Sequence, residues 1–354
     1  MHIDELLRQM SGLGASDLYL KAASPPMARV SGKTEATCPA ALTAEQVSQL
    51  AEQILSPRDR ELFARDRQVD LSYLVEGLGR FRANVYLQRG TTGMVFRRIV
   101  SDIPDVDSLG LPQVLKSLAL ERRGLVLVTG ATGSGKSTTL AAMIDYRNSQ
   151  TTGHILTIED PIEFVHKDRR CIVSQREVGL DVPDFSAGLR SGLRQAPDVL
   201  LIGEMRDVET ASAALQFAET GHLVLGTLHS TNASQTIERL LQFFPHERHD
   251  EICSLLALNL RGIVSQRLVP RLSGGRAPAI EILLGTPRVR ELLKKCAVEE
   301  LKGAMAAGAT EGMQTFDQSL YSLLQAGQIS QEDALLAADS ANELRLRMRG
   351  FSVV

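Results

Sequence analysis

The sequence predicts an α/β protein with two domains, a small α+β domain followed by a larger domain built on a parallel sheet. Residues 1–100 mix helical and strand patterns without a phosphate-binding motif. Beyond residue 113, apolar strands alternate with helices, which is the pattern of a parallel sheet covered on both faces. Residues 101–112 bring prolines, glycine and acidic residues together and predict an interdomain linker.

The first domain is expected to contain an antiparallel sheet. Helical spacing covers residues 3–10 and 44–54. Alternating or clustered apolar residues predict strands at 17–20, 69–74, 80–86 and 94–97.

The second domain, residues 113–354, is expected to place its ligand at the carboxyl ends of its strands, as open α/β sheets do. The predicted strands are 125–129, 154–159, 199–202 and 223–227. A helix is predicted from residue 136 to 146, and the tail from 299 to 349 has mostly helical spacing.

The most specific motif is a complete phosphate-binding loop, G-x-x-x-x-G-K-[ST], between a buried strand and a helix. The predicted nucleotide-binding residues are Gly130, Ala131, Thr132, Gly133, Ser134, Gly135, Lys136, Ser137 and Thr138. Backbone N–H groups and the helix N-terminus would bind the phosphates, Lys136 would add a positive charge, and Ser137 would contact Mg²⁺. The predicted cofactors are therefore ATP and Mg²⁺. The alternative is a glycine-rich turn that carries a surface lysine.

An acidic cluster follows the second strand of this domain. Glu159 and Asp160 are predicted to hold Mg²⁺ together with Ser137, directly or through water, and Glu163 is predicted to act in catalysis. A plain acidic loop with a helix cap is the alternative.

Polar residues also follow the next two strands. Glu204 stands where it can polarise an attacking water, and Gly203 occupies the place where many phosphate-loop enzymes carry an Asp. His222 and His229 bracket a buried strand and are predicted to sense the γ phosphate, the alternative being two structural histidines.

Three arginines of the first domain, Arg80, Arg82 and Arg97, lie on predicted strands. Arginine supplied by another domain or subunit can neutralise the charge that develops during phosphoryl transfer. Solvated arginines on a sheet surface are the alternative.

Composition limits the classes of partner. The formal net charge of −3 gives no overall attraction to nucleic acid or anionic membranes. The sequence lacks a signal-peptide pattern and an apolar run of about 18 residues, so membrane insertion is not expected and the protein is predicted to be cytoplasmic. The four cysteines, at 38, 171, 253 and 296, are widely spaced and predict structural thiols rather than disulfides or a zinc site.

The clusters together resemble the secretion ATPase superfamily that drives type IV pili and type II secretion. Residues 158–163 resemble its Asp box, 198–204 its atypical Walker B motif, and 221–229 its His box. Within the superfamily, the PilT/PilU type of pilus retraction ATPase is most similar. The segments that carry this likeness are 175–179, 203–207, 218–222 and 312–317.

The resemblance implies a PAS-like N-terminal domain, a RecA-like P-loop ATPase domain with a helical C-terminal tail, and a homo-hexamer. It implies that Arg80, Arg82 and Arg97 complete a neighbouring active site. It also implies a cytoplasmic motor at the base of the pilus on the inner membrane, which docks on a platform protein and powers retraction and twitching motility. A second retraction ATPase is a further expected partner.

Other readings stay open at this stage. Residues 194–198 and 229–233 resemble the accessory PilU type, and 287–294 match only loosely the motif that PilT uses in retraction. The chain would then be an accessory motor, or else a pilus or type II secretion assembly ATPase. Two rivals from other classes are a nucleic-acid motor, which needs a basic stripe, and a nucleotide-gated adaptor with incidental turnover.

Overall fold

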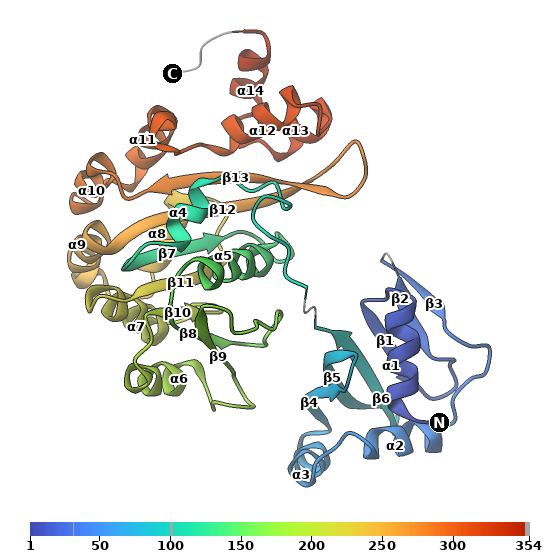
Figure 1. The fold of residues 1–354 in the computed structure, drawn as a ribbon. Helices are drawn as coiled ribbons and strands as arrows, with labels where there is room; N and C mark the ends of the chain where they lie inside the picture. Colours follow the sequence, from blue (N-terminus) through green and yellow to red (C-terminus); the bar gives the residue numbers. More distant parts are fainter. Residues whose placement is uncertain (31, 100–101, 351–354) are drawn as a thin grey trace. The chain divides into compact units, whose positions relative to one another are not determined.

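The computed structural model describes residues 1–30, 32–99 and 102–350 and divides the chain into two compact units, Met1–Asp102 and Ile103–Val354 (Figure 1). Residues 100 and 101, where the first predicted domain ends and the predicted linker starts, lie outside the described residues. The last four residues of the predicted ATPase domain do so as well.

The first unit is built on a six-stranded antiparallel sheet in the order β3-β2-β1-β6-β5-β4. Its strands are β1 (Asp17–Lys21), β2 (Met27–Val30), β3 (Lys33–Ala36), β4 (Gln68–Val75), β5 (Gly79–Gln88) and β6 (Thr91–Arg98). Its helices are α1 (Ile3–Gly12), α2 (Ala44–Glu52) and α3 (Pro57–Asp66). The four predicted strands correspond to β1, β4, β5 and β6, while β2, β3 and α3 were not predicted.

Apolar side chains from one face of this sheet form the core of the unit together with α1 and α2. On β5, Phe81, Ala83 and Val85 are buried, whereas Arg80 and Arg82 alternate with them on the other face. Side-chain capping boxes begin α2 and α3 and satisfy backbone N–H groups of their first turns. The alternation leaves a polar face that carries the arginines.

The second unit is built on a seven-stranded sheet in the order β13-β12-β7-β11-β10-β8-β9. Its strands are β7 (Gly124–Thr129), β8 (Gly153–Glu159), β9 (Cys171–Glu177), β10 (Val199–Ile202), β11 (Leu223–Leu228), β12 (Leu260–Pro270) and β13 (Arg276–Leu284). All neighbouring pairs are parallel except β12 with β13. The expected α/β class with a parallel sheet is therefore confirmed.

Helices cover both faces of this sheet, as Figure 1 shows. On β7, Leu125 and Leu127 pack into the core formed with α7, α8 and α9, whereas Val126 and Val128 pack toward α4 and α5. These helices are α4 (Val114–Ala119), α5 (Lys136–Gln150), α6 (Phe185–Gly192), α7 (Val208–Glu219), α8 (Ala233–Leu241) and α9 (His249–Asn259). Since β7 is buried on both faces, the loop that follows it starts from a fixed position.

The ends of the second unit extend this core. Val106 and Leu111, from the predicted linker segment, are buried against β7 and α5 side chains. The tail contains α10 (Pro287–Lys294), α11 (Leu301–Ala307), α12 (Phe316–Gln325), α13 (Gln331–Ala337) and α14 (Ala341–Met348). Of these, α12 to α14 bury apolar side chains against the β12–β13 hairpin.

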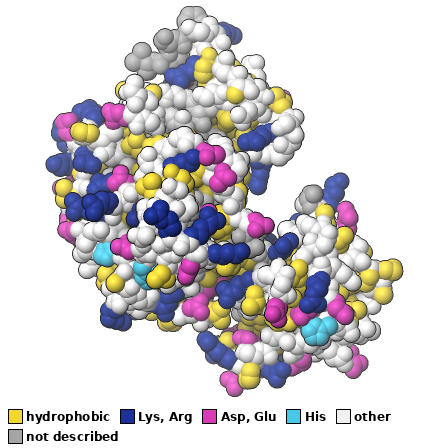
Figure 2. Space-filling view, in the orientation of Figure 1, with side chains coloured by type: hydrophobic (Ala, Val, Ile, Leu, Met, Phe, Trp, Pro, Cys, Tyr) yellow, Lys and Arg dark blue, Asp and Glu magenta, His cyan; other side chains and the backbone are white. Residues whose placement is uncertain are grey.

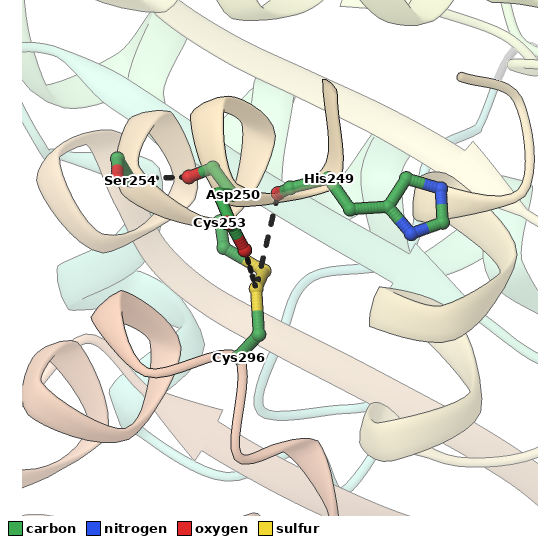
Figure 3. Close-up of a disulfide and its surroundings, with 5 residues drawn as sticks. All are labelled: His249, Asp250, Cys253, Ser254 and Cys296. Carbon is green, nitrogen blue, oxygen red and sulfur yellow. Dashed lines mark hydrogen bonds between the residues drawn. A yellow bond between two sulfur atoms is a disulfide. The ribbon is translucent and has the colours of Figure 1, made fainter. Parts of the chain in front are cut away.

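A disulfide joins Cys253 of α9 to Cys296, just beyond α10 (Figure 3). The Sγ atom of Cys296 lies 3.8 Å from the carbonyl oxygen of His249. The prediction that all four cysteines are thiols is therefore wrong for this pair. Packing of α10 on α9 brings the two residues together although they are 43 residues apart, which spacing rules for adjacent cysteines do not detect. Cys38 and Cys171 are free.

The surface carries charges of both signs, as the small net charge of the sequence suggests. On the face drawn in Figure 2, Lys and Arg side chains are interspersed with Asp and Glu. In the described part of the chain, no helix combines the length and the apolar character required to cross a bilayer.

The disulfide predicts a redox-dependent stability. A cross-link that closes a loop of this length stabilises a protein by about 3–4 kcal/mol, mainly by restricting the unfolded chain. We therefore expect Cys296→Ser to lower the melting temperature of the oxidised protein by several degrees and to have little effect in excess reductant. Cys38→Ser, which removes a free thiol, is the matched control. Equal melting temperatures of wild type and Cys296→Ser in both conditions would contradict this.

Candidate functional site

The phosphate-binding loop follows β7 directly and has the backbone shape that its glycines predict. Gly130, Gly133 and Gly135 have φ angles of 150°, 77° and 90°, which residues with a side chain rarely adopt. A Cβ atom on Gly130 would clash with the Oγ of Ser134. That Oγ atom is buried and has no hydrogen-bond partner in the described structure. The loop therefore has the close curvature and a spare polar group that suit a bound anion.

Lys136 begins α5 and folds back over this loop. Its Nζ atom donates hydrogen bonds to the carbonyl oxygens of Gly130 at 2.9 Å and Ala131 at 3.0 Å. Burial lowers the pKa of Lys136, and the carboxylates of Glu204 and Glu163 act in the opposite direction. Two predicted catalytic carboxylates are thus close enough to influence the predicted phosphate-binding lysine.

Glu204 follows β10, and both of its carboxylate oxygens have partners. Oε2 lies 2.7 Å from Nη2 of Arg206, and Oε1 lies 3.1 Å from Nε2 of His229. The Glu204 side chain is 20% exposed. The pairing with His229 arises because β10 and β11 are parallel neighbours and end at the same edge of the sheet.

The acidic segment after β8 joins this cluster through Arg206. Nη1 of Arg206 lies 3.5 Å from Oδ2 of Asp160. The pKa of Arg206 is raised, mainly by its hydrogen bond with Glu204. The Asp160–Pro161 peptide bond is cis. Glu163 is exposed nearby. Arg206, which the sequence analysis did not select, connects two of the predicted clusters.

Glu159, at the end of β8, is held by hydrogen bonds. Its Oε1 accepts hydrogen bonds from Thr157 at 2.6 Å and Gln175 at 3.1 Å, and burial raises its pKa to about 7. Within the described ranges, no three His, Cys, Asp or Glu side chains are placed to hold a metal ion. Glu159 is therefore poorly suited to bind Mg²⁺ directly. Ser137, in the first turn of α5, fits the usual arrangement in which one hydroxyl and the phosphates bind Mg²⁺ and waters supply its other ligands.

The two predicted histidines are not brought together. His229 follows the carboxyl end of β11, whereas His222 precedes the amino end of the same strand. The Nδ1 atom of His222 lies 3.1 Å from the carbonyl oxygen of Phe217 and 3.2 Å from the Oγ1 of Thr220. Six residues of extended strand separate the two sites by about 20 Å. Within one chain, this position counts against a γ-phosphate contact by His222.

The arginines of the first unit lie on the polar face of its sheet. Arg82 and Arg97 stand directly opposite each other on β5 and β6. Nη2 of Arg82 lies 3.6 Å from Asp70, and Nε of Arg97 lies 2.8 Å from the buried carboxylate of Asp17. Arg80 is on the same face of β5. Two like charges in direct opposition are unfavourable, and the two aspartates offset this cost.

A pocket of about 410 Å³ adjoins the phosphate-binding loop. Besides residues 130–134, its lining residues are Thr231, Gln266, Arg267, Leu268 and Arg276. Most of these come from β12 and β13, which carry no recognisable motif. The predominantly apolar pattern around them was the only signal, and it did not distinguish these residues from an ordinary core strand.

The loop after His229 is held from two sides. Glu281, on β13, is 1% exposed, and its Oε1 accepts a 2.7 Å hydrogen bond from the N–H of Ala233 at the start of α8. Arg267 donates to the carbonyl oxygen of Thr231 at 3.3 Å and to Asp339 at 2.6 Å. Burial is the main cause that raises the pKa of Glu281 to about 7.

Comparisons with known proteins agree with this architecture. A family model described as "Type II/IV secretion system protein" matches residues 100–344. The type IV pilus ATPase PilU of Pseudomonas aeruginosa is 49% identical over 350 residues, which are 99% of this chain and 92% of PilU. The type IV pilus retraction ATPase PilT of the same organism is 47% identical over 334 residues, which are 94% of this chain and 97% of PilT.

A solved structure is also similar over nearly the whole chain. The crystal structure of the pilus retraction motor PilT with bound ADP matches with a TM-score of 0.92 and 42% identity, covering 98% of this chain and 99% of that one. The fold predicted from the resemblance is therefore confirmed, and an ATPase activity is supported by the relatives' names.

The buried carboxyl of Glu281 predicts a pH-dependent stability. Its pKa is raised from 4.5 to about 7 in the folded protein, so between these values the folded state keeps a proton that the unfolded state has lost. Stability should therefore fall as pH rises through this window. Glu281→Gln keeps an acceptor for Ala233 and removes the titration, so its free energy of unfolding should decline less than that of wild type between pH 5 and 8. Urea unfolding at these pH values measures this difference; parallel declines would show that Glu281 is not responsible.

Proposed function

Because the chain belongs to the type II/IV secretion system protein family, we propose that it is an ATP-hydrolysing motor that powers the retraction of type IV pili. The observation that carries this proposal is the convergence of Lys136, Glu204 and His229 at one edge of the sheet. It combines with similarity to PilT and PilU over nearly the full length of each protein.

The roles proposed for individual residues follow from their positions. The loop from Gly130 to Ser137 would bind the phosphates of ATP, and Ser137 would hold Mg²⁺, which neutralises phosphate charge when bound. Glu204 would orient and activate the attacking water, with His229 and Arg206 fixing its carboxylate. Glu163 is exposed, and its carboxylate is close enough to Lys136 to raise the pKa of that lysine. It would support Glu204 or replace it.

The arginines of the first unit would act in a ring. We place Arg80, Arg82 and Arg97 at the site of a neighbouring subunit in a homo-hexamer, where they would neutralise charge during phosphoryl transfer. Carboxylate partners hold Arg82 and Arg97 on this face of the sheet, which supports a fixed orientation for these two side chains. The hexamer itself rests on the family resemblance.

The proposed setting is the cytoplasmic base of a type IV pilus, where the motor would dock on an inner-membrane platform protein. The alternative is an accessory PilU-like motor that depends on a second retraction ATPase. The observation behind this alternative is the 49% identity to PilU over 350 residues, beside 47% to PilT over 334 residues. A pilus or type II secretion assembly ATPase is a weaker alternative, since relatives named type II secretion system protein E match only about 46% of this chain.

The role of Glu204 can be tested with purified protein. Glu204→Gln keeps the size of the side chain and its contact to Arg206 but removes the charge that activates water. We expect MgATP binding within a few fold of wild type and a loss of turnover of at least 100-fold, of the size seen for general bases. Glu209→Gln, on the exposed part of α7, is a matched control. Normal hydrolysis by Glu204→Gln would remove Glu204 from the mechanism.

The direction of work is tested in cells. Lys136→Ala in place of the native protein should abolish phosphate binding and leave pili extended, so surface pilus abundance, measured by shearing and immunoblotting, should rise. Unchanged abundance with a loss of twitching would favour the accessory motor, and a loss of pili would favour an assembly ATPase. Expression of the wild-type gene alone in cells that lack all other retraction ATPases separates an independent motor from an accessory one.

A further inference from the structure

Strand β12 lies beside β7 and carries two consecutive buried polar residues, Ser265 and Gln266. Neither belongs to a motif, and their exposed fractions are 0% and 4%. Polar side chains in such a position are unfavourable unless they form hydrogen bonds. Because adjacent residues of a strand point to opposite faces, the two side chains contact different parts of the surrounding structure.

Gln266 is bonded to the helix that follows the phosphate-binding loop. Its Oε1 accepts a 2.7 Å hydrogen bond from Oγ1 of Thr139, which is 1% exposed and lies in the first turn of α5. Thr139 comes three residues after Lys136. The bond therefore fixes β12 to the turn that carries the phosphate-binding lysine.

Gln266 also lies against both ends of the loop. A Cβ atom on Gly130 would be 2.5 Å from the backbone oxygen of Gln266, and one on Gly135 would be 2.7 Å from its Nε2 atom. Gln266 therefore lies so close to Gly130 and Gly135 that a side chain at either position would collide with it. Two of the three motif glycines thus have a second reason to be glycine, which is contact with this one residue.

Ser265 supports the same loop from the opposite face of the sheet. Its Oγ accepts a 3.1 Å hydrogen bond from Oγ1 of Thr129, the residue immediately before Gly130. Thr129 in turn accepts from Thr236 of α8, which is paired at 2.7 Å with Ser230, next to His229. The entry to the loop is therefore also fixed by buried hydroxyl groups.

We infer that Gln266 is a positioning residue for ATP binding, which holds the phosphate-binding loop in shape through Thr139 and through contact with Gly130 and Gly135. It also lines the adjoining pocket. A loop shape of this kind serves the triphosphate equally in the ground state and the transition state. Its loss should therefore raise KM and the dissociation constant for MgATP while kcat changes little. This inference rests on the proposed ATPase function.

The test compares Gln266→Leu, Thr139→Val and the double variant with wild type. Each single change breaks the same hydrogen bond, so we expect KM for MgATP to rise about tenfold in each, kcat to change less than about threefold, and the double variant to resemble the singles. Gln314→Leu is the matched control, because it removes a half-buried glutamine that bonds the carbonyl oxygen of Ile280 instead. Calorimetric titration with the Mg²⁺ complex of a non-hydrolysable ATP analogue reads the same change in binding without turnover.

The outcomes separate the two proposals. Wild-type levels of KM and MgATP affinity in Gln266→Leu would overturn the inference while the motor function stands. Wild-type protein that binds MgATP without hydrolysing it would overturn the motor, and calorimetry would still decide the role of Gln266. If Gln266→Leu does not fold, Thr139→Ser and Thr139→Val provide the test. The serine variant should retain wild-type affinity for MgATP, and the valine variant should lose it. Equal affinities of the two variants would overturn the inference.

Discussion

The site depends on one constraint, the parallel alignment of β7, β11, β10 and β8. Parallel strands end at the same edge of a sheet, so the loops that follow them meet there even when they are far apart in sequence. The register pairs Leu228 with Thr129 and Ile202 with Gly226, which sets the phosphate-binding loop, His229 and Glu204 side by side. The apolar side chains of the helices on both faces hold this alignment, and the first turn of α5 adds Lys136 and Ser137 to the site.

At that edge of the sheet, the charged side chains Lys136 and Glu204 each have polar or oppositely charged partners. Lys136 is bonded to two loop carbonyls and attracted by two carboxylates, while Glu204 is shared between Arg206 and His229. A triphosphate offers Lys136 stronger acceptors than neutral carbonyl oxygens. Binding would therefore redistribute existing contacts without exposing an unpaired charge, which keeps its energetic cost low.

The sequence predicted those parts of the fold that have a strong local signal. The phosphate-binding loop, the strands that lead into polar loops and the alternating strand β5 all carry short-range patterns, and each lies where expected. Strand β12, Gln266 and the Cys253–Cys296 pair depend on long-range packing, which has no signature in one sequence. His222 was grouped with His229 because both flank one strand, and flanking residues of a strand lie at opposite edges of the sheet.

The polar face of the first unit has a mechanical consequence. Arg29, Asp17, Arg97 and Arg82 follow one another across four neighbouring strands, and hydrogen bonding between those strands makes their spacing rigid. On a flexible loop, each arginine could move independently of the others. On this sheet the backbone positions of the arginines are fixed relative to one another, so any movement of the unit carries their positive charges together.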